Sequence, residues 1–581
     1  MRVSRQFWDR FHPGWSMLLL SLLLALLVLP TTAQDPEDSA ADSEDGEAPQ
    51  ELFIETIDVN VINIEAFVTD KKGNRIIGLK KDDFELFVDG KPAKITNFYA
   101  VEDGKAQIEE GPQYIREETP EEEQVPGIEE ELEVPAEQKL HLVVYVDNYN
   151  LHPFSRNRAF GYIRTFLRTR LRAGVDEVML ISYDRSLHTR HPFTSDPELI
   201  ASTLYDLEEL TANAVHADSD RKDILEQIYE SDQLIVMRGR ANQYAGSLYN
   251  DVSFTIRALR ELVENLAGLP GRKAILYVSD GLPMRPAEDI YHALNDRFAD
   301  SSVLSESFRF DATREFQSLT GLANANRVTF YTLEAMGLRT YSYIDASNFQ
   351  ANGGPLVDQV HFSNLQHTLQ FMAEQTGGTA IINTNNFGPG LDRVADDFSN
   401  YYSLGFSSAS NSGRYHRFEV KVKGRKDFRV RLRDGFRSKT VETRVAETTL
   451  AALHYGFQEN EMGIQIDFGQ ERRGDRKHYL VPIEVKIPIG RLDLVPQSNM
   501  HRGRIRLFIG AKDNDGGIAP IQDIPIPIDI PDADYEQAKN AFFKYSLTLE
   551  MRRGRQVVAV GVRDEIGANT SYVTRGVTIG I

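Results

Sequence analysis

Residues 142–150 read Leu-Val-Val-Tyr-Val-Asp-Asn-Tyr-Asn, an apolar run that stops at an aspartate. A continuous apolar run predicts a strand buried on both faces, because a half-exposed strand would alternate apolar and polar residues. Between Phe160 and Leu171 apolar side chains then recur at helical spacing. A buried strand followed by an amphipathic helix is the unit from which the fold class of the central part of the chain is predicted.

The same step repeats further along the chain. Strands are expected at 177–183, 274–278 and 328–333, and helices at 197–210 and 248–266. Strands that are apolar on both faces and alternate with helices predict an α/β domain, with a mostly parallel, Rossmann-like sheet between two helix layers. Ligands of such sheets bind beyond the carboxyl ends of the strands. We expect the long insertions at 211–247 and 282–327 to lie at that edge.

The regions on either side of this domain are rich in strand signals. Residues 51–101 contain an alternating strand and a hairpin whose strands, at 84–88 and 93–98, flank a turn at Asp89-Gly90-Lys91-Pro92. This pattern predicts a small β module of immunoglobulin-like type. Residues 438–581 contain several short strands separated by turns, which predicts a C-terminal β-sandwich. The expected protein is therefore multidomain.

The amino-acid composition excludes several kinds of structural and catalytic site. The chain has 581 residues, 41% of them hydrophobic and 26% charged, which is a globular composition long enough for several domains. It contains no cysteine, so disulfide scaffolds, thiolate zinc sites, iron–sulfur clusters and cysteine nucleophiles are excluded. Any chemistry must use oxygen and nitrogen groups.

The formal net charge of -21 is concentrated in two segments, 34–50 and 102–134. We expect the first to be a disordered acidic spacer and the second an acidic linker, and limited proteolysis to cut both before the central domain. The rest of the chain is nearly balanced in charge. It therefore has no excess of basic residues that could bind the phosphates of a nucleic acid, and we expect no nucleic-acid partner.

The N-terminus has the pattern of an export signal. Three arginines in the first ten residues precede an apolar run at 17–29, and small residues follow up to Ala33. We expect residues 1–33 to be a signal peptide, which makes the mature protein periplasmic or extracellular, without a stable membrane span. An uncleaved anchor is the alternative, although the run is shorter than the ~20 residues that a spanning helix needs.

Six short motifs occur in a characteristic order. They are Tyr-Val-Asp-Asn-Tyr-Asn at 145–150, Pro-Gly-Arg-Lys at 270–273, Val-Ser-Asp-Gly at 278–281, Val-Thr-Phe-Tyr-Thr at 328–332, Thr-Gly-Gly-Thr at 376–379 and Tyr-Tyr-Ser-Leu-Gly-Phe at 401–406. Together they resemble the bacterial VWFA-related domain proteins of acidobacterial type, a branch of the von Willebrand factor A-like family. The resemblance covers residues 52–437, and it implies an A-like α/β domain at 135–437.

This resemblance also implies where a metal ion would bind. In the wider family, a metal-ion-dependent adhesion site holds Mg²⁺ or Mn²⁺ through an Asp-x-Ser-x-Ser turn, a threonine and a second aspartate. Asp147 matches the first aspartate and Asp280 the second, but Tyr149 and Leu151 stand at the two serine positions. We therefore expect a degenerate site.

Three other residues are candidates to replace the lost hydroxyl ligands. Asn148 and Asn150 carry amide oxygens, and Ser247 is a loose match for the threonine. Oxygen ligands suit Mg²⁺ or Mn²⁺, but so few of them predict weak binding. The alternative is that Asp147 and Asp280 bind no ion and only cap helices and organise loops.

The function expected from these features is non-catalytic. An exported A-like domain implies an adhesion or envelope scaffold protein that binds an unidentified protein partner. A cell-surface hydrolase that uses Asp147 and Asp280 as acid and base is the alternative. The chain contains no Gly-x-Ser-x-Gly elbow, Walker loop or His-Glu-x-x-His motif that would favour an enzyme.

Overall fold

The computed structural model describes residues 60–108, 139–172, 174–212, 214–339, 355–408, 413–475 and 477–580. The expected signal peptide, the acidic spacer and most of the expected linker lie outside these residues. Within the described part of the chain, no helix is both long and apolar enough to span a bilayer.

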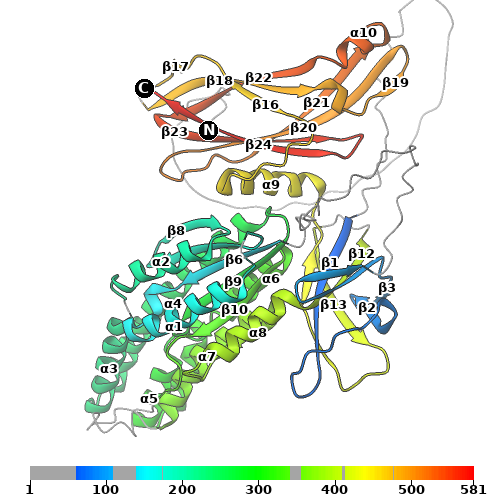
Figure 1. The fold of residues 1–581 in the computed structure, drawn as a ribbon. Coiled ribbons are helices and arrows are strands. Elements are labelled where there is room, and N and C mark those ends of the chain that lie inside the picture. Colours follow the sequence, from blue (N-terminus) through cyan, green and yellow to red (C-terminus); the bar gives the residue numbers. More distant parts are fainter. Residues whose placement is uncertain are drawn as a thin grey trace, which may run out of the picture. The chain divides into compact units, whose positions relative to one another are not determined.

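The central α/β domain, cyan to green in Figure 1, is built on a six-stranded sheet. Its strands are β6 (Leu140–Val146), β7 (Glu177–Tyr183), β8 (Leu187–Thr194), β9 (Arg272–Ser279), β10 (Val328–Glu334) and β11 (Ala380–Ile381). The order is β11-β10-β9-β6-β7-β8, and only the edge strand β8 runs antiparallel to its neighbour. Numbered within the domain, this is the doubly wound order 3-2-1-4-5-6. The mostly parallel sheet is confirmed.

Helices cover both faces of this sheet (Figure 1). They are α1 (Pro153–Arg170), α2 (Pro197–Glu208), α3 (Ala214–Glu230), α4 (Leu234–Leu266), α5 (Glu288–Phe298), α6 (Thr313–Ala325), α7 (Pro355–Gln375) and α8 (Gly388–Ser399), with 3-10 turns η3 (Asn148–Asn150) and η4 (Ser301–Phe310). α1, α2 and α8 share one apolar core with the sheet, and the C-terminal half of α4, α6 and α7 share the other. Every residue of β6 and β9 is buried, which explains the continuous apolar runs at 142–146 and 274–278 within these strands.

The two insertions fold into helices of their own. α3, the N-terminal half of α4, α5 and η4 bury a separate apolar cluster around Ile228 and Tyr291. The long helix begins at Leu234, well before the expected start near residue 248. The reason is the four-residue spacing of Met237, Ala241 and Ala245, which continues the buried stripe backwards.

The β module consists of two antiparallel sheets, of order β14-β1-β12-β4-β5 and β15-β13-β2-β3. Its elements are β1 (Asn60–Thr69), η1 (Lys81–Asp83), β2 (Phe84–Val88), β3 (Lys91–Ala93), β4 (Asn97–Glu102), β5 (Lys105–Ile108), β12 (Tyr401–Ser408), β13 (Tyr415–Val422), β14 (Arg429–Arg431) and β15 (Gly435–Arg437). A hairpin is present at the expected place, but its turn is the two residues Asp89-Gly90, both with positive φ, and its second strand is 91–93 instead of 93–98.

Two expected boundaries of this module are corrected. The family resemblance implies an α/β domain that extends to residue 437, but β12 pairs with β1 and β4, and β13 pairs with β2, so residues 401–437 belong to the β module. The expected linker began at residue 102, but a turn at Asp103-Gly104 returns the chain as β5, which pairs with β4. Alternation along a strand predicts the strand but not its partner, so the sequence does not reveal a module made from two distant segments.

The C-terminal region contains the expected β-sandwich, preceded by helix α9 (Val441–Tyr455). Its other elements are β16 (Gln465–Phe468), β17 (Arg472–Arg473), β18 (His478–Pro488), η5 (Ile489–Arg491), β19 (Val495–Gln497), β20 (Met500–Lys512), β21 (Gln522–Pro531), α10 (Asp532–Ala538), β22 (Phe542–Arg552), β23 (Gly554–Asp564) and β24 (Thr570–Ile579). One sheet is formed by β16, β17, β18 and β22, and the other by β19, β20, β21, β23 and β24.

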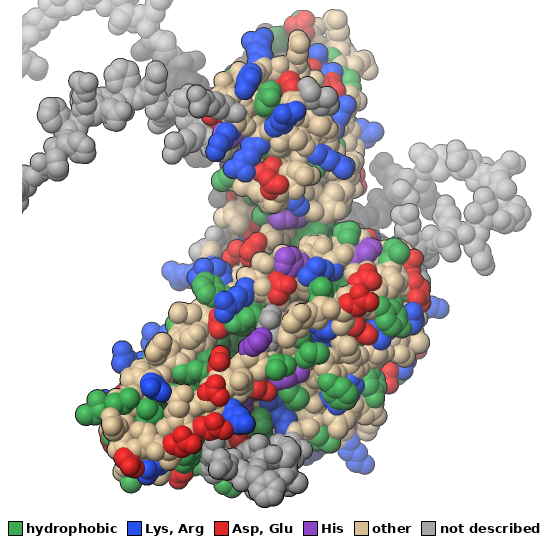
Figure 2. Space-filling model, turned by 90° about the vertical axis from the view of Figure 1, so that its left-hand side faces the viewer, with side chains coloured by type: hydrophobic (Ala, Val, Ile, Leu, Met, Phe, Trp, Pro, Cys, Tyr) green, Lys and Arg blue, Asp and Glu red, His purple; other side chains and the backbone are tan. Residues whose placement is uncertain are grey.

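Surface charges of both signs are interspersed over the face drawn in Figure 2. This distribution agrees with the nearly balanced charge expected for the chain outside its two acidic segments.

Candidate functional site

The topology brings the two predicted aspartates to one edge of the sheet. β6 and β9 are parallel neighbours, and the order of strands reverses between them. Asp147 directly follows β6, and Asp280 directly follows β9. In doubly wound sheets the ligand site lies at this switch point. The position therefore agrees with the site implied by the family resemblance.

Asp147 is completely buried and is held by donors from its own domain. Its carboxylate accepts hydrogen bonds from the Asn150 side chain at 2.9 Å, from the Ser279 hydroxyl at 3.2 Å and from the Tyr277 hydroxyl. It also caps the turn η3 by accepting from the Asn150 backbone N–H. Burial raises the pKa of Asp147 to about 6, against the opposing effect of these hydrogen bonds.

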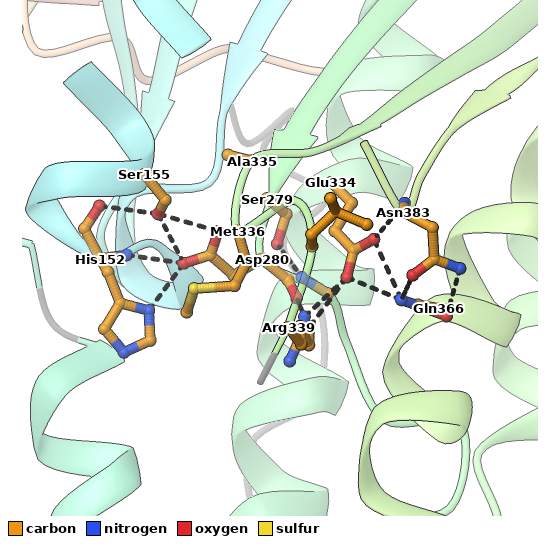
Figure 3. Close-up of polar contacts among 12 residues, drawn as sticks. His152, Ser155, Ser279, Asp280, Glu334, Ala335, Met336, Arg339, Gln366 and Asn383 are labelled. Atoms are coloured by element: carbon orange, nitrogen blue, oxygen red, sulfur yellow. Dashed lines mark hydrogen bonds and ion pairs between the residues drawn. The ribbon is translucent and has the colours of Figure 1, made fainter. Parts of the chain in front are cut away.

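Asp280 lies in a different environment, shown in Figure 3. One of its oxygens, Oδ2, accepts from the backbone N–H of His152 at 2.8 Å and lies 2.7 Å from the ring nitrogen Nδ1 of the same residue. The Ser155 hydroxyl donates to both carboxylate oxygens, at 2.9 and 3.0 Å. The first turn of α1 therefore holds this carboxylate.

The imidazole of His152 bridges two carboxylates. Its second ring nitrogen, Nε2, lies 2.8 Å from Asp218 on α3. Hydrogen bonds to Asp218 and Asp280 raise the pKa of His152 to about 9, although burial opposes the shift. The ring is thus protonated at neutral pH, and a positive charge from the chain itself lies against Asp280.

A second polar group adjoins this one (Figure 3). Glu334, the last residue of β10, is completely buried. It accepts from Arg339 Nε at 2.9 Å, from the Gln366 amide at 3.1 Å and from the Asn383 backbone at 3.0 Å. Arg339 also donates to the backbone carbonyl of Asp280 at 2.5 Å. The loops after β9 and β10 are thereby tied together.

A cavity of about 480 Å³, which we call the edge cavity, opens beside these groups. Asp280, His152 and Asn150 lie in its wall. Its other charged side chains include Asp218, Arg221, Lys222 and Arg339, and its apolar side chains include Leu225, Leu248, Met336, Leu338, Phe362 and Leu365. α3, α4 and α7 contribute to it, so part of the first insertion does lie at the binding edge.

The loop at Asp280 needs a glycine next to it. Gly281 has a φ of +115°, and a Cβ there would lie 2.7 Å from Cβ of Leu365 on α7. The absence of a side chain lets the loop pass close to α7. The Asp-Gly pair at 280–281 therefore has a structural cause as well as a chemical one.

The remaining predicted residues are not assembled around Asp280. The Asn148 amide donates to the Thr211 carbonyl at 2.8 Å and accepts from Arg156 at 2.7 Å. Ser247 has an exposed side chain in the middle of α4 and does not line the edge cavity. Asp147 is completely buried and is not part of the wall of the cavity. Of the five predicted residues, Asp280 and Asn150 reach the cavity.

These residues, as they lie, do not fit Mg²⁺ or Mn²⁺. Such ions prefer about six oxygen ligands. The carboxylates of Asp147 and Asp280 already accept hydrogen bonds from the chain, and the oxygen of Asn148 is taken by Arg156. The protonated ring of His152 would also repel a cation from Asp280.

Sequence reasoning missed His152, Ser155 and Glu334. Glu334 lies at the carboxyl end of a buried strand, as Asp147 and Asp280 do. Its position in the sequence could therefore have identified it as a candidate site residue. His152 stands directly before the proline that begins α1, but its contact with Asp218 depends on where α3 lies. No local pattern predicts that contact.

No family model matches the chain, and no curated protein matches it. Solved structures similar to it include conserved hypothetical protein BatB from Bacteroides thetaiotaomicron, with 12% identity, covering 45% of this chain and 97% of that one at a TM-score of 0.22. A von Willebrand factor type A protein from Catenulispora acidiphila has 9% identity, with 76% and 66% covered at 0.20. Proximal thread matrix protein 1 from the mussel byssus, with a zinc-occupied MIDAS motif, has 10% identity, with 45% and 47% covered at 0.20.

With TM-scores near 0.2, these likenesses carry no argument about function. The class of the central domain rests instead on its own topology. A doubly wound sheet of order 3-2-1-4-5-6 with an antiparallel edge strand and aspartates at the switch point agrees with the A-like domain that the motifs imply.

Proposed function

We propose that this chain is an exported, non-catalytic binding protein that engages a protein partner at the edge cavity of its A-like domain. It would act as an adhesion or envelope scaffold protein in the periplasm or outside the cell. The observation that carries the proposal is the edge cavity itself, whose wall combines apolar side chains with charged groups, several of which hold one another in place.

The chemistry of the cavity favours binding over catalysis. A hydrolase of the kind considered above needs two accessible carboxylates, one to donate a proton and one to accept it or to attack. Asp147 is completely buried and bonded to Tyr277 and Ser279, and Asp280 is bonded to His152 and Ser155. Neither is free to exchange a proton with a substrate without breaking this network.

The wall of the cavity suggests what kind of partner surface would fit. Leu338 is 62% exposed at the rim, and Phe362 and Met336 also line the cavity. Arg221, Lys222 and Asp218 supply charges of both signs. Apolar anchors surrounded by charged groups are typical of protein–protein interfaces. A protein segment carrying an apolar side chain flanked by charges would be complementary.

Divalent ions have a minor role in this proposal. Asp147 and Asp280, the aspartates of the degenerate adhesion site, do not fit Mg²⁺ or Mn²⁺ as they lie, so either ion would bind there only weakly, by displacing hydrogen bonds within the chain. His152 is consistent with weak metal binding, because its protonated ring already places a positive charge next to Asp280. The partner, and not the ion, would then provide most of the binding energy.

A crosslinking pull-down from native cell envelope tests the proposal. The bait is the purified protein, compared with Leu338→Asp at the cavity rim and with Ile77→Asp, a control that changes a similarly exposed residue of the β module. We expect the wild type and the control to recover the same partner and Leu338→Asp to lose it. Equal recovery by all three baits would place the interface away from the edge cavity.

The hydrolase alternative is tested separately. The wild type and Asp280→Asn are screened on glycans and peptides. We expect no turnover by either protein. Turnover by the wild type that is lost in Asp280→Asn would contradict the non-catalytic assignment.

A further inference from the structure

A second cavity, of about 390 Å³, lies near the amino-terminal end of β9, and we call it the basic cavity. Lys273, the second residue of β9, lies in its wall. Arg327 reaches it from the turn between α6 and β10, and Arg433 from the segment between β14 and β15. It is separate from the edge cavity, with which it shares no lining residue.

The wall of the basic cavity has an excess of positive charge. Its basic side chains are Lys273, Arg327, Arg433, Arg437, Lys439 and Arg444, and its acidic side chains are Glu447 and Glu459. One of the two acidic groups is already used, because Glu447 forms an ion pair with Lys439 at 2.7 Å. The cations of the wall therefore outnumber the anions that could neutralise them.

Arg433 is the most informative residue of the wall. It is only 6% exposed, and its Nη2 donates to the backbone carbonyl of Asn63 at 2.8 Å. Its Nε and Nη1 have no hydrogen-bond acceptor among the described residues. A buried guanidinium with two donor nitrogens left unpaired is costly, so an acceptor from outside the chain would stabilise it.

Arg327 repeats this pattern in part. Its Nη2 pairs with Glu65 at 3.1 Å, while its buried Nε has no acceptor among the described residues. Glu65 is buried, which raises its pKa, but Arg327, Arg272 and Arg433 together lower that pKa below its ordinary value. Glu65 forms its ion pair with Arg327, and it is also the carboxylate whose charge acts on Arg433, so one carboxylate is shared between these two guanidinium groups.

Lys273 is a second buried basic residue of the wall, after Arg433. It is 6% exposed, and its ammonium group donates to the backbone carbonyl of Leu269 at 2.8 Å. Burial, followed by the charges of Arg327 and Lys439, lowers the pKa of Lys273 to about 7. An anion bound nearby would raise the pKa of Lys273 again by offsetting the charges of Arg327 and Lys439.

We propose that the basic cavity is a binding site for a compact oxyanion of the phosphate or sulfate type, with Arg433 as its central donor. A guanidinium presents parallel N–H donors that match two oxygens of such a group, and several cations around one cavity need an acceptor with several oxygens. The volume is within the range of small-molecule sites, so the oxyanion can be carried on a small organic group. This proposal stands independently of partner binding at the edge cavity.

The test is calorimetric titration of the purified full-length protein with inorganic phosphate and, separately, with sodium sulfate. Sodium chloride at equal ionic strength controls for screening of charges. We expect phosphate, sulfate or both to bind with a Kd below about 1 mM. The stronger of the two then identifies the source of the oxyanion. Heats equal to those of chloride in both titrations would overturn the proposal.

Variants locate the site. We expect Arg433→Met to weaken oxyanion binding more than tenfold, and Arg437→Gln, at an exposed position of the wall, to weaken it three- to tenfold. Arg168→Gln on α1, which removes an exposed cation outside this wall, should leave the affinity unchanged. Arg437→Gln keeps the test decisive if Arg433→Met does not fold. Binding that survives substitution of Arg437 and, where that variant folds, of Arg433 would contradict the assignment.

Discussion

Buried charged groups lie at both ends of strand β9, but they are paired within the chain at one end and not fully paired at the other. At its carboxyl end, Asp280 is held by His152 and Ser155, and Asp147 by Tyr277 and Ser279. At its amino end, Lys273 and Arg433 face a wall in which positive charges are in excess. The first network is complete within the chain, while the second is not.

This difference shows that position in the fold does not decide what a site binds. The carboxyl edge of the sheet is where doubly wound domains hold ligands, yet here its charged groups satisfy one another. The opposite end has no such precedent in the topology, but it contains buried donors that find no acceptor in the part of the chain that the structure describes. The two ends differ in whether each buried polar side chain has its hydrogen-bond partners within the described residues.

The largest effect should follow from removing the most satisfied group of the carboxyl end. Asp147→Ala leaves Tyr277, Ser279 and Asn150 without their acceptor in a buried place. We expect the free energy of unfolding, measured by urea denaturation, to fall by about 3 kcal/mol. Asp392→Ala, which breaks an exposed pair with Arg170, is the control and should cost less than about 1 kcal/mol. Equal losses for the two variants would show that the network adds no stability.

The next effect concerns the amino end and its dependence on pH. The pKa of Lys273 is about 7 in the folded protein against an ordinary 10.5, so the unfolded chain binds more protons between these values. The contribution of Lys273 to stability is therefore most unfavourable at and below about pH 7, and it rises as pH increases from 7 toward 10.5. We expect Lys273→Met to be more stable than the wild type at pH 7, with the gap closing by pH 9.5.

Urea denaturation of both proteins at the two pH values measures this gap. If the stabilities of wild type and variant change in parallel with pH, Lys273 does not have a lowered pKa in the folded protein.

A smaller effect is expected from one hydrogen-bond donor at the carboxyl end. Ser155→Ala removes the hydroxyl that donates to Asp280, but the contacts of His152 with that carboxylate remain. The free energy of unfolding should fall by about 1 kcal/mol. Ser202→Ala on α2, where an exposed hydroxyl donates to the Leu199 carbonyl, is a matched control that should change it by less than about 0.5 kcal/mol.

The smallest effect is expected at Ser247, the candidate ligand that lies outside the edge cavity. Ser247→Ala should change stability by no more than about 0.5 kcal/mol, because the side chain is exposed in the middle of α4. It should also leave any heat of Mn²⁺ binding unaltered. A tenfold loss of Mn²⁺ affinity in this variant would restore Ser247 as a ligand.

Much of the α/β domain follows from local sequence, because buried strands and amphipathic helices have different periods. The apolar runs at 142–146 and 274–278 lie within β6 and β9, and the positions of Asp147 and Asp280 at their ends follow directly. The β module was predicted less completely. Its second half, 401–437, returns after the whole α/β domain, and strand alternation does not indicate its partner.

The candidate site shows the same limit. A strand end can be recognised from sequence, but the donor that will occupy a carboxylate cannot. His152 lies next to Asp280 because α1 begins there, and its second contact comes from Asp218, 66 residues later in α3. The orphaned donors of Arg433 likewise depend on contacts between distant segments, including the carbonyl of Asn63.

Calorimetric titration of the full-length protein with Mn²⁺ tests the central claim most directly. If the charges at the carboxyl end of β9 satisfy one another, Mn²⁺ should bind with a Kd no tighter than about 1 mM. Asp147→Ala should abolish whatever heat remains. Micromolar binding without a partner that is lost in Asp147→Ala would mean that a working metal site exists at the carboxyl end, and micromolar binding that survives this substitution would place the metal elsewhere in the chain.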